Sequence, residues 1–285
     1  MEIYIEKVVL NKLNIDFLNE NLKLGQKKLM HLLENYDELV LCSNISFESS
    51  DFEQYKFENP LFAKIAEKAL VMSFESIDDF LAKSKFEQTI ILDYNDDFNK
   101  KDLIERKGGL YFTYFNYSKK IEDIIDNFHK KIDLSERFNG WANVINFNYL
   151  NTNEIILNDN YLISKLEDIN KFVLPLIKAV KSQNELKKVV FITNYLNQQN
   201  FRLTEKIEKI RSVLNLYNVE VLHNNFRNFT NHDRILYTNF YIIECPIGFN
   251  QVNRISNSTI TIDTIFDRFT YNKRRRHIKN MELIN

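Results

Sequence analysis

The stretch Arg227–Asn250, R-N-F-T-N-H-D-R-I-L-Y-T-N-F-Y-I-I-E-C-P-I-G-F-N, holds the densest group of side chains able to bind or attack phosphate. Imidazole, guanidinium and amide groups stand close together there, ahead of an apolar run and a glycine. The residues concerned are His232, Arg234, Asn239, Gly248 and Asn250.

A related pattern occurs eighty positions upstream. Residues 152–163 read T-N-E-I-I-L-N-D-N-Y-L-I, and residues 232–243 read H-D-R-I-L-Y-T-N-F-Y-I-I. Apolar residues occupy matching places in both segments, and Asp159 falls where the second segment has Asn239. Because a motif repeated at a fixed offset is typical of internal duplication, the sequence predicts two copies of one structural unit.

The spacing His232-x-Arg234-x4-Asn239 resembles the His-x-Lys-x4-Asp motif of the phospholipase D-like superfamily of phosphodiesterases, nucleases and transferases. In that family two copies of the motif meet across a pseudo-twofold axis. The resemblance covers residues 87–265, and it is similar to His-Asp-Arg variants found in non-catalytic domains of the fold. It implies a site at His232 and Arg234, with Asn250 behind it.

In the family, one His attacks phosphorus, a second His protonates the leaving oxygen, and two Lys hold the non-bridging oxygens. Carried over to this chain, His232 is the nucleophile. Arg234 takes the place of a Lys and can bind phosphate through two parallel N–H groups. Asn239 can form hydrogen bonds, but it cannot support an imidazolium as a carboxylate would.

The first copy, Thr152-x-Glu154-x4-Asp159, departs further from the motif. Thr152 stands in place of the His, and Glu154 puts an anion where a cation would meet phosphate. The resemblance therefore implies a degenerate site that binds without cleaving. Catalysis would survive if two chains dimerised and brought together two copies of His232.

The order of expected elements predicts an α/β fold. We expect strands at 89–93, 188–193 and 219–222, a strand pair at 235–243, and amphipathic helices at 119–132 and 203–216. Alternating strands and helices favour a sheet covered on both faces. The predicted fold is a phospholipase D-like pseudo-dimer of two β-α-β repeats with mixed sheets, residues 86–164 and 165–285. Residues 1–85 form an N-terminal α/β addition, with residues 3–10 as an edge strand.

Composition restricts the partners and the location of the protein. A net charge of −1 gives no overall attraction to nucleic acid, so such binding needs a local basic patch. Cys42 and Cys245 are far apart in apolar contexts, which indicates reduced thiols in a cytoplasmic protein. No apolar run is long enough for a membrane span, no leader is evident, and Cys and His spacing predicts no metal. We expect no cofactor.

A basic run near the C-terminus is the second candidate for binding. It consists of Lys273, Arg274, Arg275 and Arg276, preceded by two aromatic residues. Such a run next to aromatic rings is typical of contacts with phosphate backbone or RNA. The alternative is that this basic run is a solvated tail or helix end that binds no ligand.

Two further patterns leave alternatives open. Arg227 and His232 match the short Arg-x4-6-His motif of helical ribonucleases called HEPN domains, which requires both residues on one helix. Asp93, Asp96 and Asp97 follow an expected strand, where metal-dependent nucleases hold Mg²⁺. Without a second acidic strand end beside it, this cluster is interpreted as a solvated loop.

Two functional hypotheses follow. The first is a degenerate phospholipase D-like module that binds nucleic acid, another phosphate ligand or a partner protein; by resemblance it would belong to a bacterial multi-protein system such as antiviral defence. The second is an active phosphodiesterase or nuclease that uses His232 as a homodimer. We expect the first, because the upstream copy lacks both the His that would protonate the leaving oxygen and the cation that would bind phosphate.

Overall fold

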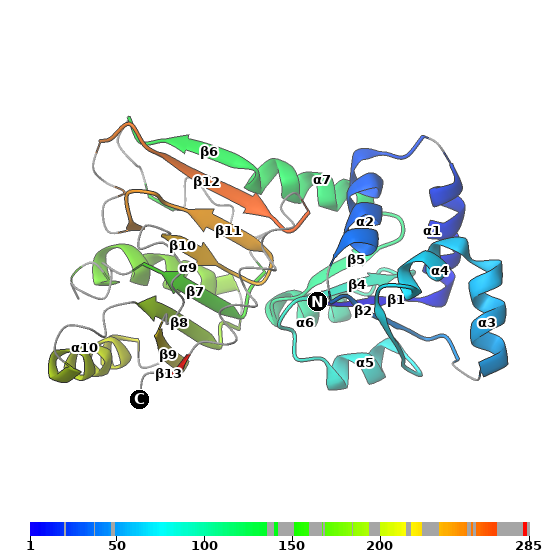
Figure 1. Ribbon diagram of the computed structural model, residues 1–285, viewed down its shortest axis with the longest axis horizontal. Coiled ribbons are helices and arrows are strands. Elements are labelled where there is room, and N and C mark those ends of the chain that lie inside the picture. The colour runs from blue at the N-terminus through cyan, green and yellow to red at the C-terminus, as the bar shows by residue number, and fades with distance from the viewer. Residues whose placement is uncertain are drawn as a thin grey trace. The chain divides into compact units, whose positions relative to one another are not determined.

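The computed structural model shows two compact units, residues Met1–Ile125 and Asp126–Asn285. It describes residues 1–283 apart from 20, 37, 47–48, 136–139, 142–150, 160–166, 168, 184, 194–199, 215–217, 224–233, 250–251, 253–254 and 267–281. The division between the units falls inside α7 (Tyr117–Phe128). Each unit is built around its own sheet (Figure 1).

The first unit has a five-stranded, all-parallel sheet with the order β3-β2-β1-β4-β5. Its strands are β1 (Glu2–Ile5), β2 (Val40–Ser43), β3 (Leu70–Ser73), β4 (Thr89–Asp93) and β5 (Leu110–Thr113). Strand β4 is buried along its whole length, as expected for the short apolar runs of sheets covered on both faces. Chain order reverses between the neighbours β1 and β4, which makes this the topological switch point of the sheet.

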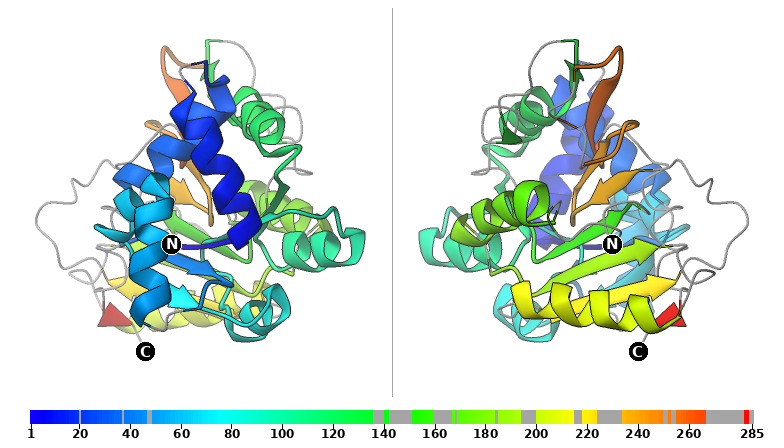
Figure 2. Two further views of the ribbon diagram at one scale, coloured as in Figure 1. Left: turned by 90° about the vertical axis from the view of Figure 1, so that its right-hand side faces the viewer. Right: turned by 90° about the vertical axis from the view of Figure 1, so that its left-hand side faces the viewer.

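Helices cover both faces of the first sheet (Figure 2, left). They are α1 (Lys7–Leu18), α2 (Leu24–Asn35), α3 (Ser49–Glu58), α4 (Pro60–Ala66), α5 (Ile77–Lys83), α6 (Phe98–Arg106) and α7. Side chains of α5 and α6, including Phe80 and Ile104, pack with Tyr4, Ile91 and Tyr111 in one core cluster. Local signals fix the helix starts: Ser76 caps α5, and Asp97 caps α6.

The second unit has an eight-stranded mixed sheet with the order β13-β9-β8-β7-β10-β11-β12-β6. Strands β7, β8 and β9 are parallel, and the other pairings are antiparallel (Figure 1). The right-hand view of Figure 2 shows the strands fanning from orange β12 to yellow β9. Their bounds are β6 (Lys130–Asp133), β7 (Glu154–Asn158), β8 (Lys188–Thr193), β9 (Asn218–His223), β10 (Ile235–Tyr237), β11 (Tyr241–Glu244), β12 (Thr259–Thr264) and β13 (Glu282–Leu283).

The helical segments of the second unit within the described residues are η3 (Ile169–Val173), α9 (Leu174–Gln183) and α10 (Asn200–Val213). Segment η3 is a short π-helix that leads directly into α9, whose second residue is Pro175. Strand β7 is joined to the parallel strand β8 through these helices, and β8 is joined to β9 through α10.

The α/β class predicted from the sequence is confirmed, but the model does not show the predicted pair of repeats. Residues 154–158 and 235–237 are the adjacent antiparallel strands β7 and β10 of one sheet. Both strands are buried, and both carry an apolar pattern. The model also divides the chain at 125/126, because β4 and β5 pair into the sheet of residues 1–85.

Among the described residues, no helix has the length and apolar character needed to cross a membrane.

Candidate functional site

Arg234 lies at the start of β10, beside the end of β7. The antiparallel register pairs Ile235 with Asn158, so Arg234 approaches the residue that follows β7. Its backbone carbonyl accepts a hydrogen bond of 2.9 Å from the Cys245 N–H, and its guanidinium donates to the Pro246 carbonyl. Arg234 is therefore held between the start of β10 and the turn after β11.

The immediate surroundings of Arg234 include a carboxylate and a thiol. Asp159 is 2% exposed, and its carboxylate accepts a hydrogen bond of 3.1 Å from the Phe249 N–H. Burial raises the pKa of Cys245 to about 12; the Asp159 carboxylate adds to this increase and Arg234 opposes it. Burial in this setting disfavours the thiolate, the form of cysteine that reacts as a nucleophile.

Asn239 occupies the opposite end of the same strand. It is completely buried in the turn after β10, and its amide oxygen accepts from the Thr152 hydroxyl at 2.6 Å and from the Asn153 N–H at 3.1 Å. Its amide nitrogen donates to the Asn153 side chain at 3.0 Å. These bonds tie the β10–β11 turn to the start of β7, so the model gives Asn239 a structural position, away from Arg234.

Thr152 and Glu154 also lie at the end of the sheet away from Arg234. Strand β7 runs from Glu154 to Asn158, and Asn158 is the residue beside the start of β10. Glu154 lies 3.6 Å from the Lys188 amine, which lies 2.7 Å from Glu220. The expectation that Glu154 opposes phosphate in the same site as Arg234 is wrong, because β7 itself separates the two groups.

Several predicted site residues lie outside the described residues. They are Arg227, His232, Asn250, Lys273, Arg274, Arg275 and Arg276. Of the predicted group, the structure therefore places Arg234 and Asn239, and it places them at opposite ends of β10.

A second polar group lies at the carboxyl edge of the first sheet. Glu6 follows β1 and Asp93 ends β4, and the parallel register pairs Ile5 with Leu92. The Glu6 carboxylate accepts a hydrogen bond of 2.9 Å from the Tyr94 N–H. Burial raises the pKa of Glu6; the Tyr94 N–H opposes this, and the Asp93 carboxylate with its hydrogen bond to Glu6 raises the pKa further.

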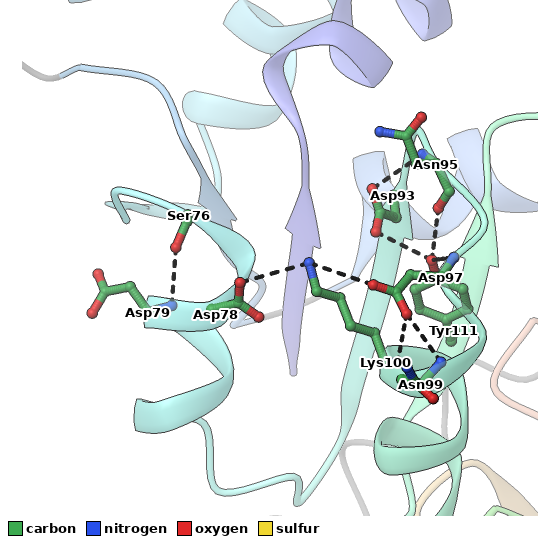
Figure 3. A network of polar contacts seen from close by, with 9 residues as sticks. All are labelled: Ser76, Asp78, Asp79, Asp93, Asn95, Asp97, Asn99, Lys100 and Tyr111. Carbon is green, nitrogen blue, oxygen red and sulfur yellow. Dashed lines mark hydrogen bonds and ion pairs between the residues drawn. The ribbon is translucent and has the colours of Figure 1, made fainter.

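Figure 3 shows how Asp93 is held. The Tyr111 hydroxyl lies 3.1 Å from the Asp93 carboxylate and 2.7 Å from the Asn95 carbonyl, and it accepts from the Asp97 N–H at 3.2 Å. The other Asp93 oxygen accepts from the Asn95 N–H at 3.2 Å. Asp93 is 4% exposed, so this carboxylate is both buried and fixed in orientation.

The three aspartates grouped in the sequence separate in the structure. Asp97 caps α6 by accepting from the Asn99 and Lys100 N–H groups at 3.0 and 3.1 Å (Figure 3). Asp96 is exposed. Asp93 alone of the three lies against Glu6, which is the second acidic strand end that the sequence interpretation lacked. Sequence reasoning missed Glu6 because it continued the first strand through residue 10.

No family model matches this sequence, and no curated protein matches it.

Proposed function

We propose that residues 126–285 form a degenerate phospholipase D-like module that binds the phosphate groups of a nucleic acid without cleaving them. The observation that carries this proposal is the position of Arg234, which stands for the motif's lysine. It lies at the sheet edge formed by the end of β7, the start of β10 and the turn after β11. An arginine in that position offers a planar, permanently charged donor to phosphate.

Loss of cleavage is supported by the geometry of the upstream segment. Thr152 is hydrogen-bonded to Asn239, and residues 154–158 form a strand of the same sheet. Each chain would therefore supply one motif and one His232. The family's chemistry needs a second His as the acid, so an active enzyme would require two chains.

The neighbouring carboxylate sets the expected strength of binding. Asp159 lies close enough to Arg234 for both to influence the Cys245 thiol. A carboxylate near the guanidinium opposes the approach of a second anion, so we expect weak, salt-sensitive binding, with dissociation constants of about 10⁻⁴–10⁻⁶ M. The basic residues 273–276 would add contacts to the backbone of a longer strand.

Fluorescence anisotropy with labelled single-stranded RNA and DNA at several salt concentrations tests the proposal. We expect Arg234→Ala to weaken binding and Arg234→Lys to restore part of it, because the charge returns without the planar fork. Arg211→Ala is the matched control, since Arg211 is exposed on α10. Thermal unfolding of each variant checks that the fold is intact.

Absence of binding at low salt would contradict the proposal, as would equal weakening by Arg211→Ala and Arg234→Ala. A variant with Arg274, Arg275 and Arg276 changed to Ala separates the two contributions. If binding is lost in that variant and unchanged in Arg234→Ala, the ligand is held by the basic run and the motif site has no part in it.

A further inference from the structure

The first sheet has one buried edge strand and one open edge strand. Strand β5 lies at one edge, and all four of its residues are buried. Strand β3 lies at the other; among the described strands it pairs with β2 alone, and none of its four residues is buried. An exposed edge strand presents N–H and C=O groups that can pair with another strand, so native proteins usually block such edges.

The hydrogen bonds between β2 and β3 show which backbone groups of β3 face outward. The Leu70 and Phe74 N–H groups donate to the carbonyls just before and at the end of β2, at 3.0 and 2.9 Å. Because alternate residues of a strand bond to the same neighbour, Met72 also turns its backbone groups toward β2. The N–H and C=O groups of Val71 and Ser73 therefore point to the open side of the sheet.

The side chains of β3 lack the features that block strand pairing. The strand reads Leu-Val-Met-Ser, without a charge or a proline. Leu70 is 63% exposed, and Met72 is 43% exposed. The edge strand β6 of the second sheet is equally short but reads Lys-Lys-Ile-Asp, and charges of this kind prevent association between sheet edges. Strand β3 is thus open to pairing in both its backbone and its side chains.

The exposed apolar side chains of β3 continue the core of the first unit. The register places Leu70 beside Val40 and Met72 beside Cys42. Cys42 belongs to the core cluster that contains side chains of α5 and α6, and Val40 packs against that cluster. Phe74, two residues after Met72, also belongs to it. A further strand with apolar side chains on this face would extend the same core across the edge.

We propose that β3 is a homodimer interface, at which it pairs antiparallel with β3 of a second copy of this chain. The outward groups fix the register, because Val71 can exchange both N–H···O=C bonds with the second copy's Ser73. Met72 then lies opposite its own copy at the twofold axis, and the apolar side chains of both strands lie on one face of the joined sheet. Because β3 is uncharged, self-pairing places no like charges opposite each other within the strand.

Sedimentation equilibrium of the full chain tests the proposal. The paired strands are short, so we expect a weak dimer with a dissociation constant of about 1–100 µM. Val71→Pro removes an outward N–H and no bond to β2, and proline is tolerated on the free side of an edge strand. We expect Val71→Pro to weaken the dimer by about 10-fold or more through lost hydrogen bonds. Val71→Ala is the matched control, because it keeps the N–H.

Cysteine substitutions test the register and show that the partner is a second copy. Met72→Cys places two thiols opposite each other, with Cα atoms about 4.5 Å apart, which a disulfide can span. Leu70→Cys is the control, because the two copies of this position lie four residues apart along the paired strands, or about 13 Å. Under mild oxidation we expect a covalent dimer from Met72→Cys and none from Leu70→Cys. The native Cys42 and Cys245 are buried.

A full chain that stays monomeric at every concentration would overturn the proposal and leave the edge to a strand of another protein. A dimer unchanged in Val71→Pro, or equal cross-linking of the two cysteine variants, would also overturn it. If thermal unfolding shows that Val71→Pro does not fold, Met72→Lys replaces it, since this change brings two cations together at the twofold axis. Its control is Ile15→Lys on α1, where Ile15 is 63% exposed. These readouts do not depend on phosphate binding by Arg234.

Discussion

At the scale of single residues, burial divides the predicted site into different roles. Asn239 and Arg234 are five positions apart in one motif, yet the first is enclosed by hydrogen bonds and the second is partly exposed at the sheet edge. Motif spacing gave the identity of the polar residues. It could not give their separation, because that depends on where β10 begins and ends.

The structural role of Asn239 predicts a large loss of stability on truncation. Asn239→Ala removes the acceptor of the Thr152 hydroxyl and the Asn153 N–H inside a buried turn. We expect the free energy of unfolding to fall by about 2–4 kcal/mol, because buried donors are left unsatisfied. Urea unfolding followed by fluorescence of Trp141, the single tryptophan, reports on this unit.

Asn218→Ala is the control for that measurement, because Asn218 is exposed at the start of β9. Its effect should stay within about 0.5 kcal/mol. Equal unfolding midpoints for the two variants would show that the Asn239 bonds do not support the fold.

At the scale of elements, two ionic contacts of helices in the first unit contribute to stability with opposite dependences on pH. Burial raises the pKa of Glu105 on α6, although Lys120 on α7 lies 3.7 Å away and acts against the increase. On α5, the hydrogen bond from Lys83 lowers the pKa of Asp79, with a separation of 2.7 Å between the charged atoms.

We therefore predict that the difference in stability between wild type and a neutral variant changes with pH in opposite directions for Glu105→Gln and Asp79→Asn. The stability that Glu105 contributes is present below its unfolded pKa, about 4.3, and is lost as pH rises through its folded value. Glu105→Gln should gain stability relative to wild type as pH rises above about 4.3. The contribution of Asp79 is present above its unfolded pKa, about 3.9, and is lost as pH falls. Asp79→Asn should lose stability relative to wild type as pH rises.

Calorimetric melting temperatures of wild type and both variants, taken between about pH 3 and pH 7, span the two unfolded pKa values. If the melting-temperature difference between variant and wild type changes with pH in the same direction for both variants, the account of these two contacts is contradicted. The same holds if each difference changes in the direction opposite to the one predicted.

Elements dominated by local pattern could be predicted from the sequence, and elements that depend on distant partners could not. The strands expected at 89–93 and 188–193 coincide with β4 and β8, and the strand pair expected at 235–243 matches β10 and β11 to within one residue. Residues 3–10 were expected as one edge strand. In the structure β1 is the centre of its sheet and ends at Ile5, and Val9 and Leu10 belong to the buried face of α1.

At the scale of the whole molecule, sequence similarity between two segments did not show how those segments pair. Strands β7 and β10 are buried neighbours in one sheet. Local patterning predicted the α/β class, but long-range strand pairing decided the division at 125/126. The Glu6–Asp93 pair escaped prediction for the same reason, since the two residues are far apart in sequence and meet through the β1–β4 register.

The central claim is that the module at residues 126–285 binds phosphate without cleaving it. The most direct test is incubation of the full chain with labelled single- and double-stranded RNA and DNA, with and without EDTA, beside His232→Ala. We predict no cleavage in the presence of EDTA. Cleavage that requires metal and survives His232→Ala would not come from the motif site and would leave the claim intact. Cleavage that resists EDTA and disappears in His232→Ala would contradict it and identify an active phospholipase D-type enzyme.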